Sequence, residues 1–362
     1  MTTTGSGIIL GDPVPWFGAP EAINGKIVRA EFHYSGGRPD RLFADDAATR
    51  RAGRTAKPPR RSHFRVTAAN IPDNIVRLRL PRGAAHQQKG DAAMDLGMTG
   101  KTALVTGGSA GIGKAITRVL AREGVDVAIC ARRKEPLEQT AAEIARQTNR
   151  KIVPIVADLT KPEDAENFVK QAHAALGRID ILVNNAGSSP GGVLDHLSEA
   201  DWAQSLQLKF MGYVRCLKHV LPIMQKQKKG RVVNLIGNDG VKYSYWEIAP
   251  GAANAAGQNL TKSLCSQYGK DNISFVAVNP GPVRTERWTG LVKAMARDMK
   301  LSYEEADQLA PKSIPLGRIA EVDEVANLVA YLASDLAFFV NGTMIEIDGG
   351  QDKVLMDRMR DR

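Results

Sequence analysis

The feature that most constrains the fold is a glycine-rich stretch, Thr106-Gly-Gly-Ser-Ala-Gly-Ile-Gly113, which lies between an apolar run and a helical pattern. A strand, a glycine turn and a helix in this order bring backbone amides to a helix N-terminus, where free N–H groups and the helix dipole favour an anion such as a pyrophosphate. Gly107 permits the tight turn, and Gly111 and Gly113 lack the Cβ atoms that would block the phosphate or the strand. Because an ordinary β–α turn can have a similar glycine-rich sequence, the stretch predicts a dinucleotide site only together with further motifs.

From residue 100 onward, apolar runs of strand length alternate with helical patterns, which predicts β–α units and a parallel sheet. The expected strands are 102–106, 125–131, 152–156, 179–183, 231–236, 273–278 and 344–347. The expected helices after the first are 136–147, 162–176, 199–227, 252–268, 288–299, 303–309 and 322–333. Pro222 predicts a kink or break in the longest of them. We therefore expect one α/β domain over residues 94–362, a doubly wound parallel seven-stranded sheet of the Rossmann type.

Residues 1–93 differ in composition from the rest of the chain. They contain 15 Lys and Arg against 8 Asp and Glu, so +7 of the net charge of +10 lies there. Gly and Pro break every hydrophobic period, and too little apolar surface is available to offset the entropy of ordering. We expect a basic, mostly disordered extension, which could be translated sequence upstream of a start at Met94 or Met98. A transit peptide and a nucleic-acid arm are alternatives that the acidic residues and the aromatic pattern disfavour.

Composition also limits the compartment and the partners of the chain. No run approaches the length of a membrane span. The three cysteines lie far apart and the six histidines show no metal-ligand spacing, which favours a reduced setting without disulfides or a zinc site. We expect a cytoplasmic protein that binds a small molecule and has no metal, membrane or nucleic-acid partner.

Four further motifs follow the glycine turn: Asp158-Leu159, Asn184-Asn-Ala-Gly187, Asn279-Pro-Gly-Pro-Val-Arg-Thr285 and Ile347-Asp-Gly-Gly350. Together the five motifs resemble the short-chain dehydrogenase/reductase family, in particular its 3-oxoacyl-carrier-protein reductase branch, over about residues 96–352. The resemblance implies a homo-oligomer, either a dimer or a tetramer, that binds a nicotinamide dinucleotide. It assigns Gly107, Ser109, Gly111, Ile112 and Gly113 to the pyrophosphate and ribose, and Asp158 and Leu159 to the adenine. It assigns Asn185, Ala186 and Gly187 to the cofactor ribose, and Pro280, Gly281, Val283 and Thr285 to the nicotinamide amide.

The end of the second strand bears on the choice of cofactor. An acid at this place binds the ribose 2′-hydroxyl of NAD, whereas a basic residue suits the 2′-phosphate of NADP. The sequence here is Cys130-Ala-Arg-Arg133, so Arg132 or Arg133 offers a planar guanidinium to the phosphate. This favours NADP(H) over NAD(H), and the alternative is that the two arginines are only the solvated start of a helix.

The residues at the family's catalytic places are all different in this chain. The resemblance implies a tyrosine that protonates the carbonyl, a lysine four residues later that lowers its pKa, a serine that orients the substrate, and an asparagine on the preceding helix. By local register the serine place holds Gly237, the tyrosine place Pro250, the lysine place Asn254 and the asparagine place Lys209. The chain contains no Tyr that is followed by Lys four residues later.

The lysine and the asparagine have changed places between the two helices. We therefore predict that Lys209 and Asn254 lie together near the cofactor. Lys209 is expected to supply the positive charge and is a candidate proton donor, because desolvation can lower a lysine pKa toward the working range. A solvated helix lysine is the alternative. Asp239, Tyr243 and Tyr245, on the loop after the fifth strand, are other candidate acids.

The helical insert over residues 288–315 is expected to cover the nicotinamide end of the site. Its apolar residues favour an apolar or aromatic ketone or alcohol as substrate, although packing of the insert would explain them equally well. Three functions stay open: an NADP(H)-dependent oxidoreductase that interconverts a ketone and a secondary alcohol with an atypical proton donor, a lyase or isomerase on the same scaffold, and an inactive NADP-binding subunit of a hetero-oligomer.

Overall fold

The computed structural model describes residues 22–23, 26–27, 94–352 and 356–357. The chain divides into two units, Met1–Gly90 and Asp91–Arg362. In the first unit, the described residues form a short antiparallel pair of strands, β1 (Ala22–Ile23) and β2 (Lys26–Ile27). The predicted disorder of residues 1–93 otherwise lies outside the described residues.

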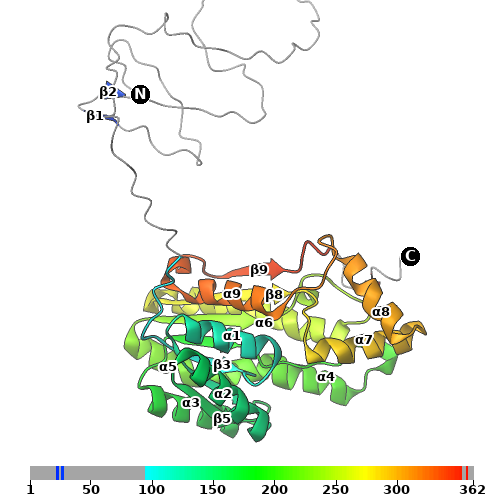
Figure 1. The fold of residues 1–362 in the computed structure, drawn as a ribbon, viewed down its shortest axis with the longest axis horizontal. Coiled ribbons are helices and arrows are strands. Elements are labelled where there is room, and N and C mark those ends of the chain that lie inside the picture. The colour runs from blue at the N-terminus through cyan, green and yellow to red at the C-terminus, as the bar shows by residue number, and fades with distance from the viewer. Residues whose placement is uncertain (1–21, 24–25, 28–93, 353–355, 358–362) are drawn as a thin grey trace, which may run out of the picture. The chain divides into compact units, whose positions relative to one another are not determined.

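The second unit is built on a parallel sheet of seven strands in the order β5-β4-β3-β6-β7-β8-β9, with β5 and β9 at opposite edges (Figure 1). The strands are β3 (Thr102–Thr106), β4 (Asp126–Ala131), β5 (Ile152–Val156), β6 (Ile181–Asn184), β7 (Gly230–Leu235), β8 (Ile273–Pro280) and β9 (Thr343–Ile347). The order reverses between β3 and β6, where such sheets bind ligands at the carboxyl ends of their strands. The predicted doubly wound sheet is therefore confirmed.

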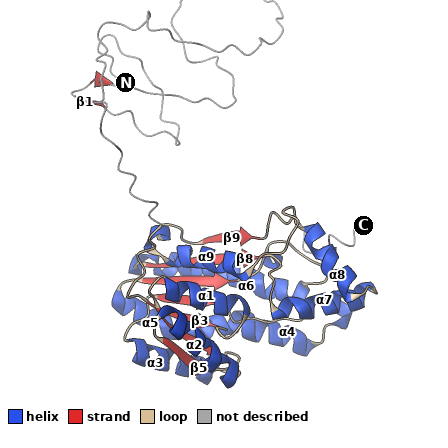
Figure 2. Ribbon diagram, viewed as in Figure 1, coloured by secondary structure: helices blue, strands red, loops and turns tan. Residues whose placement is uncertain are grey.

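Helices cover both faces of the sheet (Figure 2). Side chains of β3 alternate between two cores, with Ala103 and Val105 in one and Leu104 in the other, as a strand buried on both faces requires. The first core contains α1 (Gly111–Arg122), α2 (Lys134–Thr148) and α9 (Val322–Ala333). The second contains α3 (Pro162–Leu176), α5 (Met211–Gln227) and α6 (Ile248–Tyr268).

The predicted long helix 199–227 is interrupted, but not at its proline. It consists of α4 (Glu199–Ser205), a π-helical turn over Leu206–Phe210, and α5, which continues through Pro222. The expected break at Pro222 is thus wrong, and the deviation lies more than two turns earlier. Helix α6 also begins four residues before the predicted start, because Pro250 falls in its first turn, where a missing N–H costs no helical hydrogen bond.

The helical insert consists of α7 (Glu286–Met299) and α8 (Tyr303–Leu309), which lie at the end of the sheet near the carboxyl ends of the strands (Figure 1). These helices have a small core of their own, in which Trp246 and Trp288 pack with Val292 and Met295. Most apolar residues of the insert are used in this core. Only those that also face a cavity bear on the polarity of a substrate.

Candidate functional site

The glycine turn, residues 106–113, has a backbone that only glycine fits easily. Gly107 and Gly111 have φ angles of +69° and +53°. A Cβ atom at Gly113 would lie 2.2 Å from the carbonyl oxygen of Gly107 and 2.5 Å from the side chain of Asn185. Glycine at these places therefore lets the chain make a tight turn at the start of a helix. This is the geometry that lets backbone N–H groups approach a dinucleotide, so the residues present fit such a group.

Two further observations support this fit. Helix α1 starts at Gly111 without a side-chain cap on its N–H groups and without an acidic residue in its first turn, so its positive dipole end is not neutralised. The end of β6 is tied to the turn, because the backbone N–H groups of Asn185 and Ala186 donate to Thr106 Oγ1 and Asn185 Nδ2 donates to the Thr106 carbonyl. The strand, the turn and the next strand thus hold one another in place.

A cavity of about 430 Å³ opens at the carboxyl ends of the strands, beside the glycine turn. It runs from the start of α1 to the start of α7, and Ile236 and Leu291 contribute apolar walls. The predicted site residues that line it are Gly107, Gly111, Ile112, Gly113, Asn185, Ala186, Gly187, Lys209, Asp239, Pro280, Gly281, Val283 and Thr285.

The other predicted cofactor residues lie outside this cavity. Ser109 is in the turn itself, while Arg132 and Arg133 are exposed at the end of β4. Asp158, at the end of β5, has a lowered pKa: burial raises it, but hydrogen bonds from Thr160 and the charge of Arg132 outweigh that effect. Leu159 follows and is buried. The influence of Arg132 on Asp158 indicates that both stand at the same edge, where the adenine half of a dinucleotide would lie.

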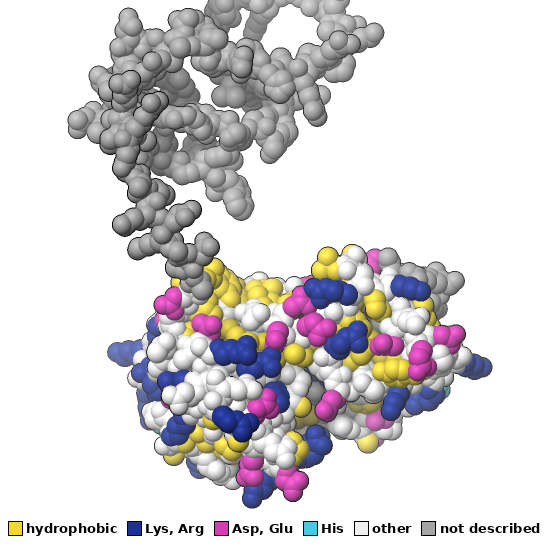
Figure 3. Space-filling view, viewed as in Figure 1, with side chains coloured by type: hydrophobic (Ala, Val, Ile, Leu, Met, Phe, Trp, Pro, Cys, Tyr) yellow, Lys and Arg dark blue, Asp and Glu magenta, His cyan; other side chains and the backbone are white. Residues whose placement is uncertain are grey.

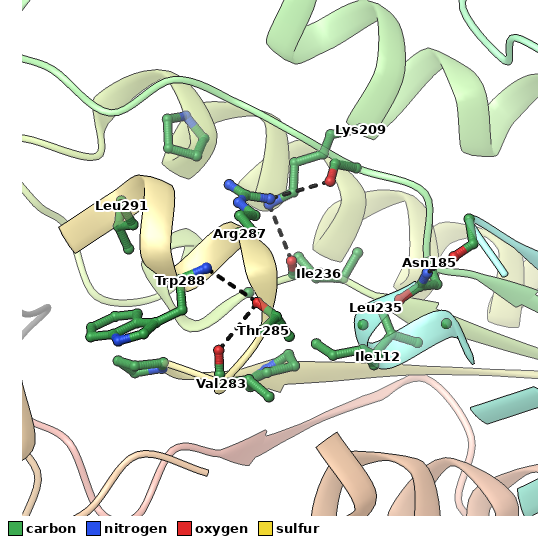
Figure 4. A pocket seen from close by; sticks show the side chains of 18 of the residues that line it. Ile112, Asn185, Lys209, Leu235, Ile236, Val283, Thr285, Arg287, Trp288 and Leu291 are labelled. Atoms are coloured by element: carbon green, nitrogen blue, oxygen red, sulfur yellow. Dashed lines mark hydrogen bonds between the residues drawn. The ribbon is translucent and has the colours of Figure 1, made fainter. Parts of the chain in front are cut away.

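The structure brings the three predicted catalytic residues together in one hydrogen-bonded group, the Lys209 cluster. Lys209 Nζ donates to Asn254 Oδ1 at 2.5 Å. It also donates to the carbonyl oxygen of Ile236 at 3.2 Å (Figure 4). Asn254 Nδ2 in turn donates to Asp239 Oδ1. Lys209 and Asp239 line the cavity, whereas Asn254 is 2% exposed and lies behind them. Asn254 thus links Lys209 and Asp239 through its side chain and does not itself line the cavity.

Lys209 owes its position to the π-helical turn between α4 and α5, a type of irregularity often found at functional sites. Its aliphatic stem passes so close to Gly187 that a Cβ atom there would lie 2.8 Å from Lys209 Cγ. The pKa of Lys209 is lowered to about 8, chiefly by burial; the charges of Asp239 and Glu247 oppose this shift, and the charge of Arg287 adds to it. The prediction of a desolvated lysine at this place agrees with this environment.

Gly237, in the place of the family serine, is linked to the Lys209 cluster. Its φ angle is +150°, and a Cβ atom there would lie 2.5 Å from both Asn254 Nδ2 and Asp239 Oδ1. A serine therefore cannot replace this glycine unless the Asn254–Asp239 pair moves.

The two tyrosine candidates do not reach the cavity. Tyr243 is 93% exposed, and neither Tyr243 nor Tyr245 is among the residues that line it. The backbone N–H of Tyr245 instead donates to Asp357. Both tyrosines lie on the loop after β7, as predicted, but their side chains do not line the cavity.

Three charged residues that line the cavity, Glu247, Glu286 and Arg287, were not predicted from the sequence. Glu247 precedes α6 and stands three residues before Pro250, so its place ahead of the tyrosine position was a signal that could have been used. Arg287, in the first turn of α7, donates from Nη1 to the Gly187 carbonyl and from Nη2 to the Ser189 carbonyl. Arg287 thereby joins the insert to the loop after β6 and points toward Lys209 (Figure 4).

The surface shows charges of both signs interspersed on the face seen in Figure 3. Among the described residues, no helix is long and apolar enough to cross a membrane. The same residues contain no group of three or more His, Cys, Asp or Glu that could hold a metal ion.

Comparisons with known proteins give one family model and several similar proteins. The model of the short chain dehydrogenase family matches residues 101–296. The 3-oxoacyl-[acyl-carrier-protein] reductase of Thermotoga maritima is 33% identical over 253 residues, 70% of this chain and 98% of that protein. Oxidoreductase UcpA of Salmonella typhimurium is 37% identical over 256 residues, 70% of this chain and 95% of that protein. The structure of L-sorbose reductase from Gluconobacter frateurii, complexed with NADPH and L-sorbose, matches with a TM-score of 0.68 and 29% identity, covering 72% of this chain and 100% of that one.

Proposed function

The chain belongs to the short-chain dehydrogenase family and is an NAD(P)-dependent oxidoreductase, and we propose that it uses NADP(H) to interconvert a ketone and a secondary alcohol. One observation carries the proposal. A single cavity joins the glycine turn, which fits a dinucleotide, to a desolvated lysine in contact with Asn254. Pyrophosphate binding and a positive charge at the reacting end are the two things that this chemistry requires from a protein.

The bound cofactor would supply the hydride, and the chain's own residues would do the rest. Gly107, Gly111 and Gly113 would let backbone N–H groups approach the pyrophosphate. Lys209 makes two of its three possible donations to protein oxygens and has one left for an oxygen in the cavity. Its positive charge would stabilise the negative charge that develops on a carbonyl oxygen during reduction. Asn254 and Asp239 would hold the ammonium group in this position.

The preference for NADP(H) is supported by the end of β4, where Arg132 and Arg133 are exposed and no acid is present. A hydrogen bond to a charged group contributes about 1.5–3 kcal/mol. We therefore expect the double substitution Arg132→Ala and Arg133→Ala to raise the Kd for NADPH roughly 10- to 100-fold. The Kd for NADH should stay within about twofold, because NADH has no 2′-phosphate.

Fluorescence titration of both nucleotides checks this expectation. Arg146→Ala, an exposed arginine in the last turn of α2, is the matched control and should change neither Kd. Equal losses for NADPH and NADH in the double variant would mean that the arginines do not read the 2′-phosphate.

A carbonyl-reduction screen tests the function itself. The protein should quench or shift its tryptophan fluorescence on binding NADPH, since Trp288 lines the cavity, and should then consume NADPH with members of a ketone panel. Substrate conversion without consumption of NADPH would favour a lyase or isomerase. Binding without turnover across the panel would favour a non-catalytic subunit of a hetero-oligomer.

The class of substrate and the assembly are finer points of the proposal. Ile236, Trp288 and Leu291 give the cavity an apolar side, which suits an apolar or aromatic ketone or alcohol. Leu336 and Phe339 are exposed next to the edge strand β9, and such a surface supports a homo-oligomer, a dimer or tetramer. The three free cysteines support a reducing compartment such as the cytoplasm.

A further inference from the structure

Glu247 is a carboxyl group on the cavity wall that the proposed chemistry has not yet used. It immediately precedes α6, and its backbone is fixed on both sides, because its N–H donates to Ser244 Oγ and its carbonyl accepts from Gly251 N. Within residues 94–352 and 356–357, its carboxyl group makes no hydrogen bond or ion pair. A carboxyl group without a partner that faces a ligand cavity is rare, because burial of its charged form is unfavourable.

The charges around Glu247 come from several elements. Asp239 follows β7, Arg287 is on α7, Lys209 is on the π-helical turn, and Asp357 lies near the end of the chain. Burial raises the pKa of Glu247 to about 8, with Asp239 and Asp357 acting in the same direction and Arg287 and Lys209 opposing them. At neutral pH the group is therefore mostly a neutral acid, which can donate a proton.

We infer that Glu247 is the proton donor of this site, in place of the tyrosine that Pro250 replaces. The inference rests on the proposed oxidoreductase function. In the reductive direction the carbonyl carbon receives the hydride from NADPH, and the π electrons of the C=O bond move to the oxygen. The oxygen takes the carboxyl proton of Glu247, which leaves a secondary alcohol, NADP⁺ and the Glu247 carboxylate. Water then returns a proton to the carboxylate, and in the oxidative direction the carboxylate accepts the proton from the alcohol.

The geometry assigns the stabilising positive charge and the proton donation to different residues. The ammonium group of Lys209 is held by Asn254 and the Ile236 carbonyl, so it is a fixed charge on the cavity wall. Proton loss from Lys209 would remove this charge while negative charge is still developing on the oxygen. Glu247 loses no stabilising contact when it gives up its proton, and the charges of Arg287 and Lys209 favour the carboxylate that results.

The test has one readout on the cofactor-free protein and one on turnover. With ¹³C-labelled glutamate, the carboxyl resonance that is lost in Glu247→Gln should titrate near pH 8. The same variant should reduce a ketone with a kcat about 100-fold or more below that of the wild type at pH 7, within the range of general acid catalysis. Its Kd for NADPH should stay within about threefold, which also shows that it is folded. Glu247→Asp, which keeps a shorter acid, should recover part of the lost kcat.

Glu304→Gln, an exposed glutamate on α8, is the matched control and should behave as the wild type in both readouts. A titration of the Glu247 resonance near the ordinary glutamate value of about 4.3, or a Glu247→Gln kcat within about threefold of the wild type, would overturn the inference alone. A wild-type protein that binds NADPH but reduces no carbonyl compound would overturn the proposed function and this inference with it.

Discussion

Lys209→Met is expected to lower kcat for ketone reduction about 1000-fold, because it removes the positive charge that faces the developing oxyanion. The protein should also lose about 1–3 kcal/mol of stability, because the change leaves Asn254 Oδ1, in a side chain that is 2% exposed, without its donor. In the wild type, the charge is present below the lowered pKa of about 8 and is lost above it, so kcat/KM for reduction should fall as the pH rises through 8. Steady-state kinetics at several pH values and a thermal melt check these results.

Lys218→Met is the matched control for this prediction. Lys218 is an exposed lysine on α5, less than three turns from Lys209, and its replacement should leave kcat and the pH profile unchanged. A Lys209→Met enzyme with more than about a tenth of the wild-type kcat would assign the electrostatic role to another residue, with Arg287 the next cation in the cavity.

Gly113→Ala is expected to abolish NADPH binding, with a Kd at least about 100-fold higher than that of the wild type. The added Cβ would lie 2.2 Å from the Gly107 carbonyl oxygen, and this neighbour is backbone, which cannot rotate away. The turn must therefore open, and a small displacement at a site that binds through fixed backbone groups has a large effect. Isothermal titration with NADPH measures the change.

Gly290→Ala is the matched control, because it makes the same change of residue type at a place away from the glycine turn. Gly290 lies in α7 and has nothing within 4 Å of its would-be Cβ, so the variant should bind NADPH normally and be slightly more stable. A Gly113→Ala protein that melts like the wild type but binds no NADPH would show that the glycine turn holds the cofactor. Unchanged NADPH affinity in a folded Gly113→Ala protein would rule out that role for the turn.

Most of the fold could be predicted because its signals are local. Strands and helices are recognisable from apolar periods a few residues long, and the glycine turn requires backbone angles that few other residues adopt. The errors occur where longer-range packing decides. The π-helical turn at Leu206–Phe210 has no sequence signature, whereas the prediction placed the irregularity at Pro222, which α5 tolerates.

The candidate site likewise contains features that the sequence predicts and features that depend on long-range packing. The pairing of Lys209 with Asn254 was predicted from an exchange of residue types between two helices, and the two side chains are in contact although 45 residues separate them. Arg287 was not predicted, because nothing local distinguishes it from other charged residues at helix starts, and Glu247 was overlooked although it stands three residues before Pro250. Tyr243 was a reasonable candidate by position, but the loop exposes its side chain to solvent.

The sequence by itself determined the doubly wound sheet and the glycine turn, and it predicts that the family's usual catalytic residues are replaced. The sheet and the turn depend on residue types and spacings that act within one β–α unit. Only the tertiary structure decided which charged groups share the cavity, because Lys209, Asp239, Glu247 and Arg287 come from separate elements that meet at the carboxyl edge of the sheet. Their protonation depends on burial and on one another's charges, and both arise only when the chain is packed.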